Sequence, residues 1–173
     1  MELHEGTALL MRTPAILEVW LEDLPEAWLE ADEGPETYSP RDVLGHLIHG
    51  EKTDWLPRLR LIRAKGDSEP FEAFDRAGFR ESIRGRTTRE LLEEFAALRR
   101  ANLDELASFD LTATSMEARG LHPALGAVTV AQLLATWVTH DLDHLGQIAR
   151  VMAKRQDADV GPWKAYLGIL NRG

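Results

Sequence analysis

The sequence contains no cysteine among its 173 residues. A chain without cysteine forms no disulfide, holds no metal or iron–sulfur cluster through thiolates, and has no cysteine nucleophile. The rest of the composition is that of a folded chain, with 44% hydrophobic and 28% charged residues. Because domains most often contain about 100–200 residues, we expect a single domain spanning residues 1–173.

Positive charge is also scarce. The chain has 20 lysines and arginines against 29 aspartates and glutamates, which gives a formal net charge of −9. Duplex nucleic acid is repelled at long range by a chain of this sign, so nucleic acid is not an expected partner. The best candidate for a local basic patch lies at residues 58–65, and a solvated helix face explains it better.

The chain has no long apolar run. No window of about 18 uninterrupted apolar residues is present, so no segment is expected to span a bilayer. The first six residues, MELHEG, have neither the basic region nor the apolar stretch of a secretory signal. We therefore expect a cytoplasmic protein with no membrane partner.

Four long segments carry helical periodicity, and no convincing strand pattern competes with them. They cover residues 7–30, 40–65, 87–109 and 129–154, separated by long connections at 66–86 and 110–128. A short helix is expected after Gly161-Pro162. The pattern predicts an all-α fold, specifically a four-helix bundle with long connections and a short C-terminal helix.

Local signals refine these helices. Ser39, Thr87 and Thr129 are expected to cap the second, third and fourth helices. Three prolines are expected to interrupt helices: Pro14 near a fresh start at Thr13, Pro25 near the end of the first segment, and Pro57 as a kink in the second. Three phenylalanines at 71, 74 and 79 indicate that the first long connection packs against the body of the protein.

Histidines on two of the helices suggest a metal site. His140 and His144 are four residues apart, so they lie about 40° apart on one helix face, within or beside its apolar arc. Such a pair can hold one metal ion, and His46, which borders the apolar arc of the second helix, can supply a third imidazole. Three nitrogen ligands leave positions open for water or substrate, as in catalytic centres. His49 is the rival of His46 for the third position.

Two carboxylates fall in the middle of the apolar arcs, Glu51 on the second helix and Asp141 on the fourth. They are candidates for orienting a ligand histidine, or, together with Asp54, for acting as a general base. The alternative is that Glu51 and Asp141 are buried groups bonded to backbone or arginine.

The runs SPRDVLGHL at 39–47 and VTVAQLLATWVTHDLDHLGQIAR at 128–150 resemble signature segments of the DinB-like superfamily. The tail VGPWKAYL at 160–167 is similar to one branch of it. The resemblance covers nearly the whole chain and implies a four-helix bundle, often homodimeric, with a divalent ion such as nickel or zinc bound by His46, His140 and His144.

The resemblance also implies a class of chemistry. The superfamily includes transferases that use low-molecular-weight thiols and a thiol-dependent isomerase. We therefore expect a metal-dependent thiol transferase or hydrolase that acts on a small electrophilic molecule. The alternatives are a non-catalytic metal-binding or stress-response bundle, and an interaction module with an empty polar pocket. Three histidines suit zinc, nickel, copper or iron comparably.

Overall fold

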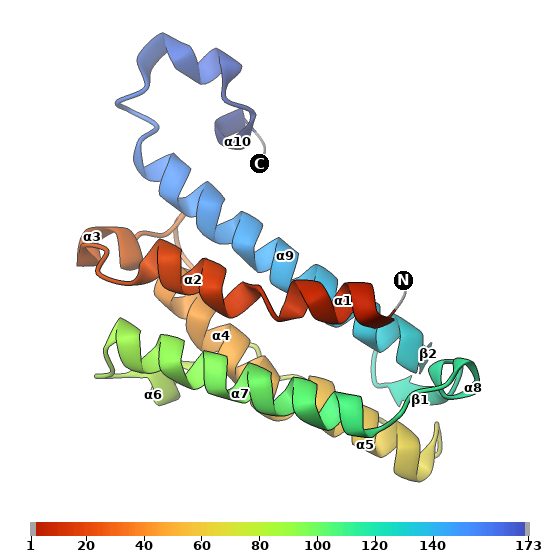
Figure 1. Ribbon diagram of the computed structural model, residues 1–173. Coiled ribbons are helices and arrows are strands. Elements are labelled where there is room, and N and C mark those ends of the chain that lie inside the picture. Colours follow the sequence, from red (N-terminus) through yellow and green to blue (C-terminus); the bar gives the residue numbers. More distant parts are fainter. Residues whose placement is uncertain (1–2, 172–173) are drawn as a thin grey trace.

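Four helical rods form the body of the protein (Figure 1), which is described here by a computed structural model for residues 3–171. The elements in chain order are α1 Leu3–Leu10, α2 Thr13–Leu21, α3 Glu26–Leu29, α4 Pro40–Thr53, α5 Trp55–Lys65, α6 Arg80–Ile83, α7 Thr88–Ser108, α8 Ala113–Met116, β1 Arg119–His122, β2 Gly126–Thr129, α9 Val130–Arg155, the 3-10 helix η1 Gly161–Tyr166 and α10 Gly168–Asn171. The rods are α1–α2, α4–α5, α7 and α9, and each contacts two others. The expected four-helix bundle is confirmed.

The helix starts predicted from capping residues are confirmed. Ser39, Thr87 and Thr129 each accept a hydrogen bond from the backbone N–H three residues on, and the side chain of that residue accepts one from the backbone N–H of the cap. These reciprocal bonds satisfy N–H groups that have no partner inside the helix. They fix where α4, α7 and α9 begin, and therefore the register of the histidines on α4 and α9.

The kink expected at Pro57 is displaced to Asp54, between α4 and α5. Proline lacks the N–H that would bond to Thr53, and its ring clashes with the carbonyl four residues earlier. The helix accordingly stops at Thr53 and restarts at Trp55, with Asp54 at φ −111° and ψ −73°. The prediction named the right cause but placed the break three residues too late.

The first segment, expected over 7–30 with interruptions near Thr13 and at Pro25, is three helices. It begins earlier than predicted, at Leu3, and breaks at Met11–Arg12, just before Thr13-Pro14. Pro25 caps the one-turn helix α3. Both interruptions coincide with the prolines that were expected to cause them.

The expectation of no strands is wrong at the second connection. Residues 119–129 form a two-stranded antiparallel hairpin in which His122 pairs with Gly126. The three-residue loop closes because Gly126 adopts φ +77°, a conformation that glycine tolerates. Four-residue strands are too short to show a convincing alternation of polar and apolar residues, so periodicity missed them.

The first long connection packs onto the bundle, as its phenylalanines indicated. Phe71 and Phe79 are buried, and Phe79 lies beside α4 at Gly45. A Cβ at Gly45 would lie 2.7 Å from both Phe79 and Ile83, so only glycine permits this close approach. The connection therefore forms a wall next to His46, the following residue on α4.

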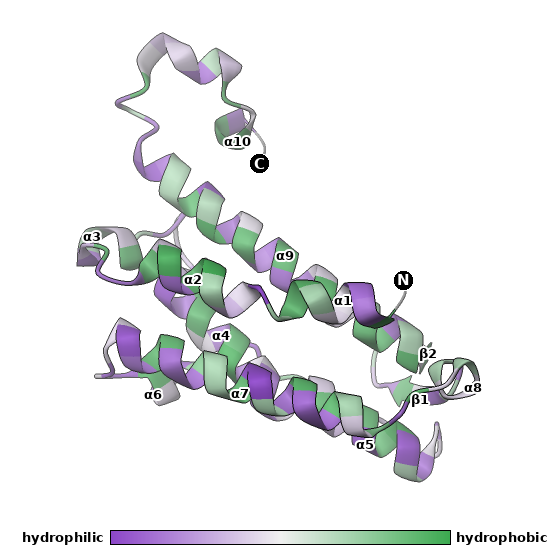
Figure 2. Cartoon of the chain, in the orientation of Figure 1, coloured by the Kyte–Doolittle hydropathy of each residue, from purple (hydrophilic) through white to green (hydrophobic). Residues whose placement is uncertain are grey.

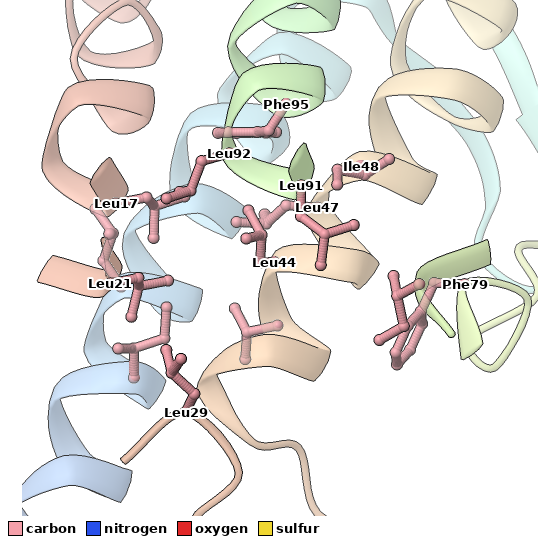
Figure 3. Packing of buried hydrophobic residues seen from close by; sticks show 14 residues of the cluster. Leu17, Leu21, Leu29, Leu44, Leu47, Ile48, Phe79, Leu91, Leu92 and Phe95 are labelled. Carbon is pink, nitrogen blue, oxygen red and sulfur yellow. The ribbon is translucent and has the colours of Figure 1, made fainter. Parts of the chain in front are cut away.

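Apolar stripes along the rods (Figure 2) meet in two separate core clusters. One contains Leu44, Leu47 and Phe95 (Figure 3). The other lies toward the hairpin and contains Leu56, Leu59 and Leu134. Between the two clusters, each rod contributes one buried polar residue, and we call this set the Arg99 layer: Thr13, Glu51, Arg99 and Asp141.

The C-terminal segment after Gly161-Pro162 is helical, as expected. It contains η1 and α10 and extends beyond the end of the bundle (Figure 1). Leu170 is buried, whereas Trp163 and Tyr166 are 72% and 84% exposed. Within residues 3–171, no helix is both long and apolar enough to cross a bilayer. The expected homodimer stays a prediction.

Candidate metal site

His46, His140 and His144 meet at the contact between α4 and α9, and we call them the histidine cluster. The Nε2 atom of His140 lies 3.1 Å from Nε2 of His46 and 3.1 Å from Nε2 of His144. One nitrogen of each ring lies within 4.8 Å of the other two. Residues that are nearly a hundred positions apart in the sequence thus point their ring nitrogens at one place.

Hydrogen bonding alone does not account for this geometry. In a neutral imidazole, one ring nitrogen carries a hydrogen and the other a lone pair, so Nε2 of His140 offers a single group to two close neighbours. One cation satisfies three lone pairs at once. Imidazole binds zinc at about 2.0–2.1 Å, which sets two nitrogens about 2.8–3.4 Å apart over the range from octahedral to tetrahedral angles. The observed separations of 3.1 Å fall in this range.

Burial keeps the histidine cluster in the neutral form that binds metals. It lowers the pKa of His46 to about 4 and that of His140 to about 3, and the neighbouring imidazole of His144 lowers both. Burial also lowers the pKa of His144, although the hydrogen bond to Gln147 opposes this. Neutral imidazoles present lone pairs, whereas protonated ones repel a cation.

Gln147 orients one ring of the cluster. Nδ1 of His144 lies 2.8 Å from Oε1 of Gln147, so a hydrogen on Nδ1 can be donated to the amide oxygen. This arrangement leaves the lone pair on Nε2, the atom that faces the other histidines. Nδ1 of His46 and Nδ1 of His140 are buried and have no hydrogen-bond partner within residues 3–171.

Aromatic rings hold the other two histidines. The His46 ring packs at right angles to Phe74, with centroids 5.3 Å apart, and lies 5.5 Å from Tyr38. The His140 ring packs edge-to-face on Trp55 at 5.1 Å. Trp55 and Phe74 come from outside the two helices that carry the cluster. The segment around the helix break and the first long connection therefore both help to position it.

The carboxylates expected near the histidines are bound to Arg99 instead. The Arg99 guanidinium, 1% exposed, donates to Glu51 Oε1 at 2.8 Å and to both oxygens of Asp141 at 2.6 and 3.0 Å. Thr13 and Trp137 donate to the same carboxylates at 2.6 and 3.0 Å. This arrangement matches the alternative given for Glu51 and Asp141 in the sequence analysis, namely that both are buried groups bonded to arginine.

No hydrogen bond within residues 3–171 joins either carboxylate of the Arg99 layer to the histidine cluster. Their oxygens are occupied by Arg99, Thr13, Trp137 and the amide of Asn102. An orienting or general-base role for Glu51 and Asp141 therefore stays a prediction. Arg99 was missed, although it follows Leu91, Leu92 and Phe95 at helical spacing and so falls on their buried face.

The other histidines lie outside the cluster. His49, the rival of His46, packs beside Phe74 with ring centroids 5.1 Å apart and is close to Gly78. His4 is exposed on α1. His122 lies in the hairpin, where its Nδ1 accepts from the backbone N–H groups of Ala124 and Leu125.

A cleft of about 1220 Å³ opens over the histidine cluster. Its walls come from the segment 32–38, the helix break at Asp54–Trp55, the first long connection, the hairpin and α9. Residues of the connection that sequence reasoning did not assign to the site include Arg76 and Arg80. In the sequence, only the three phenylalanines of that connection indicated that it packs against the bundle and so can form a wall of the cleft.

Fold and site together define a helical bundle with a three-imidazole cluster at the base of a cleft. A family profile, that of the DinB superfamily, matches residues 9–148, and the chain belongs to this superfamily. The resemblance seen in the sequence is thereby confirmed.

Among solved structures, the chain is similar to YfiT from Bacillus subtilis, with a TM-score of 0.75 and 18% sequence identity. The similarity covers 89% of this chain and 87% of that one. YfiT is described as a probable metal-dependent hydrolase with an unusual four-helix bundle topology. At this identity the likeness shows a shared fold. No curated protein matches the chain.

Proposed function

We propose that the protein is a divalent-metal-dependent hydrolase that acts on a small molecule bound in the cleft. The observation that carries this proposal is the convergence of the three Nε2 atoms, with that of His140 lying 3.1 Å from each of the other two. His46, His140 and His144 would hold the ion. The description of YfiT as a probable metal-dependent hydrolase supports the same class of activity.

The donor set suits catalysis better than a purely structural role. Three neutral imidazoles leave the positive charge of a divalent ion intact and leave coordination positions free. A bound ion of this kind acidifies water so that a nucleophile is available near neutral pH. The cleft supplies room for a substrate beside it. Zinc and nickel are our preferred ions, although imidazole also suits copper and iron.

A thiol could occupy the same position as water, which would make the protein a thiol transferase. The sequence resemblance supports this finer proposal, and the same assay separates it from hydrolysis. Turnover of an electrophile that requires an added low-molecular-weight thiol would indicate transfer, whereas turnover without thiol would indicate hydrolysis.

The test compares zinc- or nickel-loaded protein with protein stripped by a chelator, on a panel of esters, amides and alkylating electrophiles with and without thiol. We expect turnover that disappears on chelation and returns when the metal is added back. Turnover that survives chelation would contradict the proposal. One bound metal per chain without any turnover would favour a non-catalytic metal-binding bundle, and no bound metal would favour an interaction module.

A further inference from the structure

Asp54 occupies the helix break at the wall of the cleft. It is 8% exposed and lines the same cleft as the histidine cluster. The next residue, Trp55, packs edge-to-face on the His140 ring at 5.1 Å. The break caused by Pro57 is therefore the feature that brings this carboxylate to the cleft.

Asp54 differs from the other carboxylates that line the cleft. Asp32, Asp42 and Glu33 are used locally: Asp32 and Asp42 accept backbone N–H groups, and Glu33 binds Arg150 at 2.8 Å. Glu36 and Asp143 are exposed to solvent. Asp54 alone among these six is buried. Arg58 pairs with its Oδ1, whereas its Oδ2 has no hydrogen bond or ion pair within residues 3–171.

The surroundings of Asp54 move the pKa of its carboxyl toward neutral pH. Burial raises its pKa to about 6, while its ion-pair partner Arg58, one turn further along α5, acts in the opposite direction. The Arg58 guanidinium lies over the Phe71 ring at 5.2 Å, and His122 on the hairpin lines the same wall. Trp55, the residue after Asp54, connects this wall to His140 of the histidine cluster. A carboxyl that titrates near neutral pH is suited to general acid–base catalysis.

We propose that Asp54 is a catalytic residue of the hydrolase, which moves a proton between the attacking water and the leaving group. This inference rests on the proposed function. The ionised carboxylate removes a proton from water as the water oxygen bonds to the substrate carbonyl carbon. The bond from that carbon to the leaving group then breaks, and the carboxyl returns the proton to the departing oxygen.

Two ester substrates distinguish removal of the proton from water from its return to the leaving group. The variant Asp54→Asn keeps the shape of the side chain but neither removes nor returns a proton. In zinc-loaded protein we expect turnover of ethyl acetate to fall about 100-fold or more. The loss should be smaller for p-nitrophenyl acetate, because nitrophenolate departs without a proton. The control, Asp67→Asn, removes an exposed carboxylate outside the cleft and should leave both rates unchanged.

Three further measurements distinguish catalysis from a structural effect. Zinc affinity of Asp54→Asn by calorimetry should stay within about twofold of the parent protein. The turnover rate of the parent, measured against pH, should change with an apparent pKa near 6. Asp54→Asn should lack this dependence and Asp54→Glu should retain it. Carbon-13 NMR of metal-free protein should show one aspartate carboxyl that titrates near pH 6 and is missing from Asp54→Asn.

The outcomes are separable. If the zinc-loaded parent hydrolyses neither ester and none of the esters, amides and electrophiles of the earlier panel, the proposed function is contradicted, and so is the role of Asp54 that rests on it. If the parent is active and Asp54→Asn is equally active with the same pH profile, only the role of Asp54 is overturned. If Asp54→Asn does not fold, Asp54→Glu decides, since loss of the pH dependence near pH 6 in that variant also contradicts the proposal.

Discussion

The Arg99 layer and the histidine cluster both use residues of α4 and α9, and yet their polar groups are in opposite states. In the Arg99 layer, both carboxylates are occupied by the guanidinium and by neutral donors. In the histidine cluster, three lone-pair atoms face one another, and two Nδ1 atoms have no partner within residues 3–171. Nε of Arg99 also has no partner within residues 3–171, so the contrast lies in the acceptors. Carboxylates whose oxygens are all bonded serve the fold, whereas several converging lone pairs point to a ligand.

Helix geometry separates the two centres. Asp141 follows His140 directly, so their side chains point about 100° apart around α9. Asp141 faces the middle of the bundle and is 3% exposed, while His140 faces the cleft. Adjacent residues thus serve different centres, and substitutions in each centre should have different consequences.

The largest change in stability should come from removing the buried cation of the Arg99 layer. Arg99→Met leaves Glu51 and Asp141 buried without their cation, and breaking a buried ion pair from one side costs about 3–5 kcal/mol of the free energy of unfolding. Urea denaturation measures the change. The control Arg100→Met alters the exposed neighbour and should cost no more than about 0.5 kcal/mol. Equal stability of both variants would show that the layer contributes little to the fold.

The second effect concerns pH in chelated protein. The pKa of His46, about 4, and that of His140, about 3, lie below their ordinary value of 6.5. Below pH 6.5 the unfolded chain therefore binds protons that the folded chain does not, and the free energy of unfolding falls as pH drops. At pH 5 the loss should be about 2 kcal/mol for His46 alone, and up to about 4 kcal/mol with His140.

Urea denaturation of chelated protein at pH 7 and pH 5 checks this second effect. The double variant His46→Asn/His140→Asn removes both imidazoles and should show a much flatter dependence over that interval. A parent protein that is equally stable at the two pH values would contradict neutral burial of the rings.

Metal binding should raise stability by a somewhat smaller amount. Zinc at about 100 times its dissociation constant adds about 2.7 kcal/mol to the free energy of unfolding, because it binds the folded state. His144→Ala removes one ligand and should abolish this gain. His49→Ala, outside the cluster, should retain it. Thermal denaturation with and without zinc measures both, and a full gain in His144→Ala would exclude the predicted ligand set.

The smallest effect should come from the residue behind a ligand. Gln147→Leu removes the acceptor for Nδ1 of His144, and loss of such a partner weakens metal binding about 10-fold or more, or about 1.4 kcal/mol. Gln147→Glu keeps an acceptor oxygen and should bind zinc as tightly as the parent protein. Calorimetric titration of the two variants distinguishes them. Equal weakening in both would indicate that the acceptor is not what matters.

What the sequence predicted correctly depends on neighbours along the chain. Caps at Ser39, Thr87 and Thr129 act over three residues, and the pairing of His140 with His144 follows from one turn of helix. The approach of His46 from the other rod was predicted because it borders an apolar arc and because the resemblance places it there.

What the sequence did not reveal depends on contacts between distant segments. The Arg99 layer needs all four rods, and the wall beside His46 needs the connection that carries Phe74 and Phe79. The hairpin at 119–129 is stabilised by pairing of two very short strands and by packing against α5 and α9. None of these contacts has a local period, although Arg99 on an otherwise apolar helix face was a readable signal.

The stacked indoles of Trp55 and Trp137 give the molecule a built-in optical reporter. Their rings are 5.7 Å apart and 11° from parallel, close enough for their electronic transitions to couple and to appear in circular dichroism. One indole touches His140 and the other donates its N–H to Glu51. Fluorescence quenching by an open-shell ion would therefore register events at the histidines without any label, and a change in the coupled dichroism would register loosening around the guanidinium.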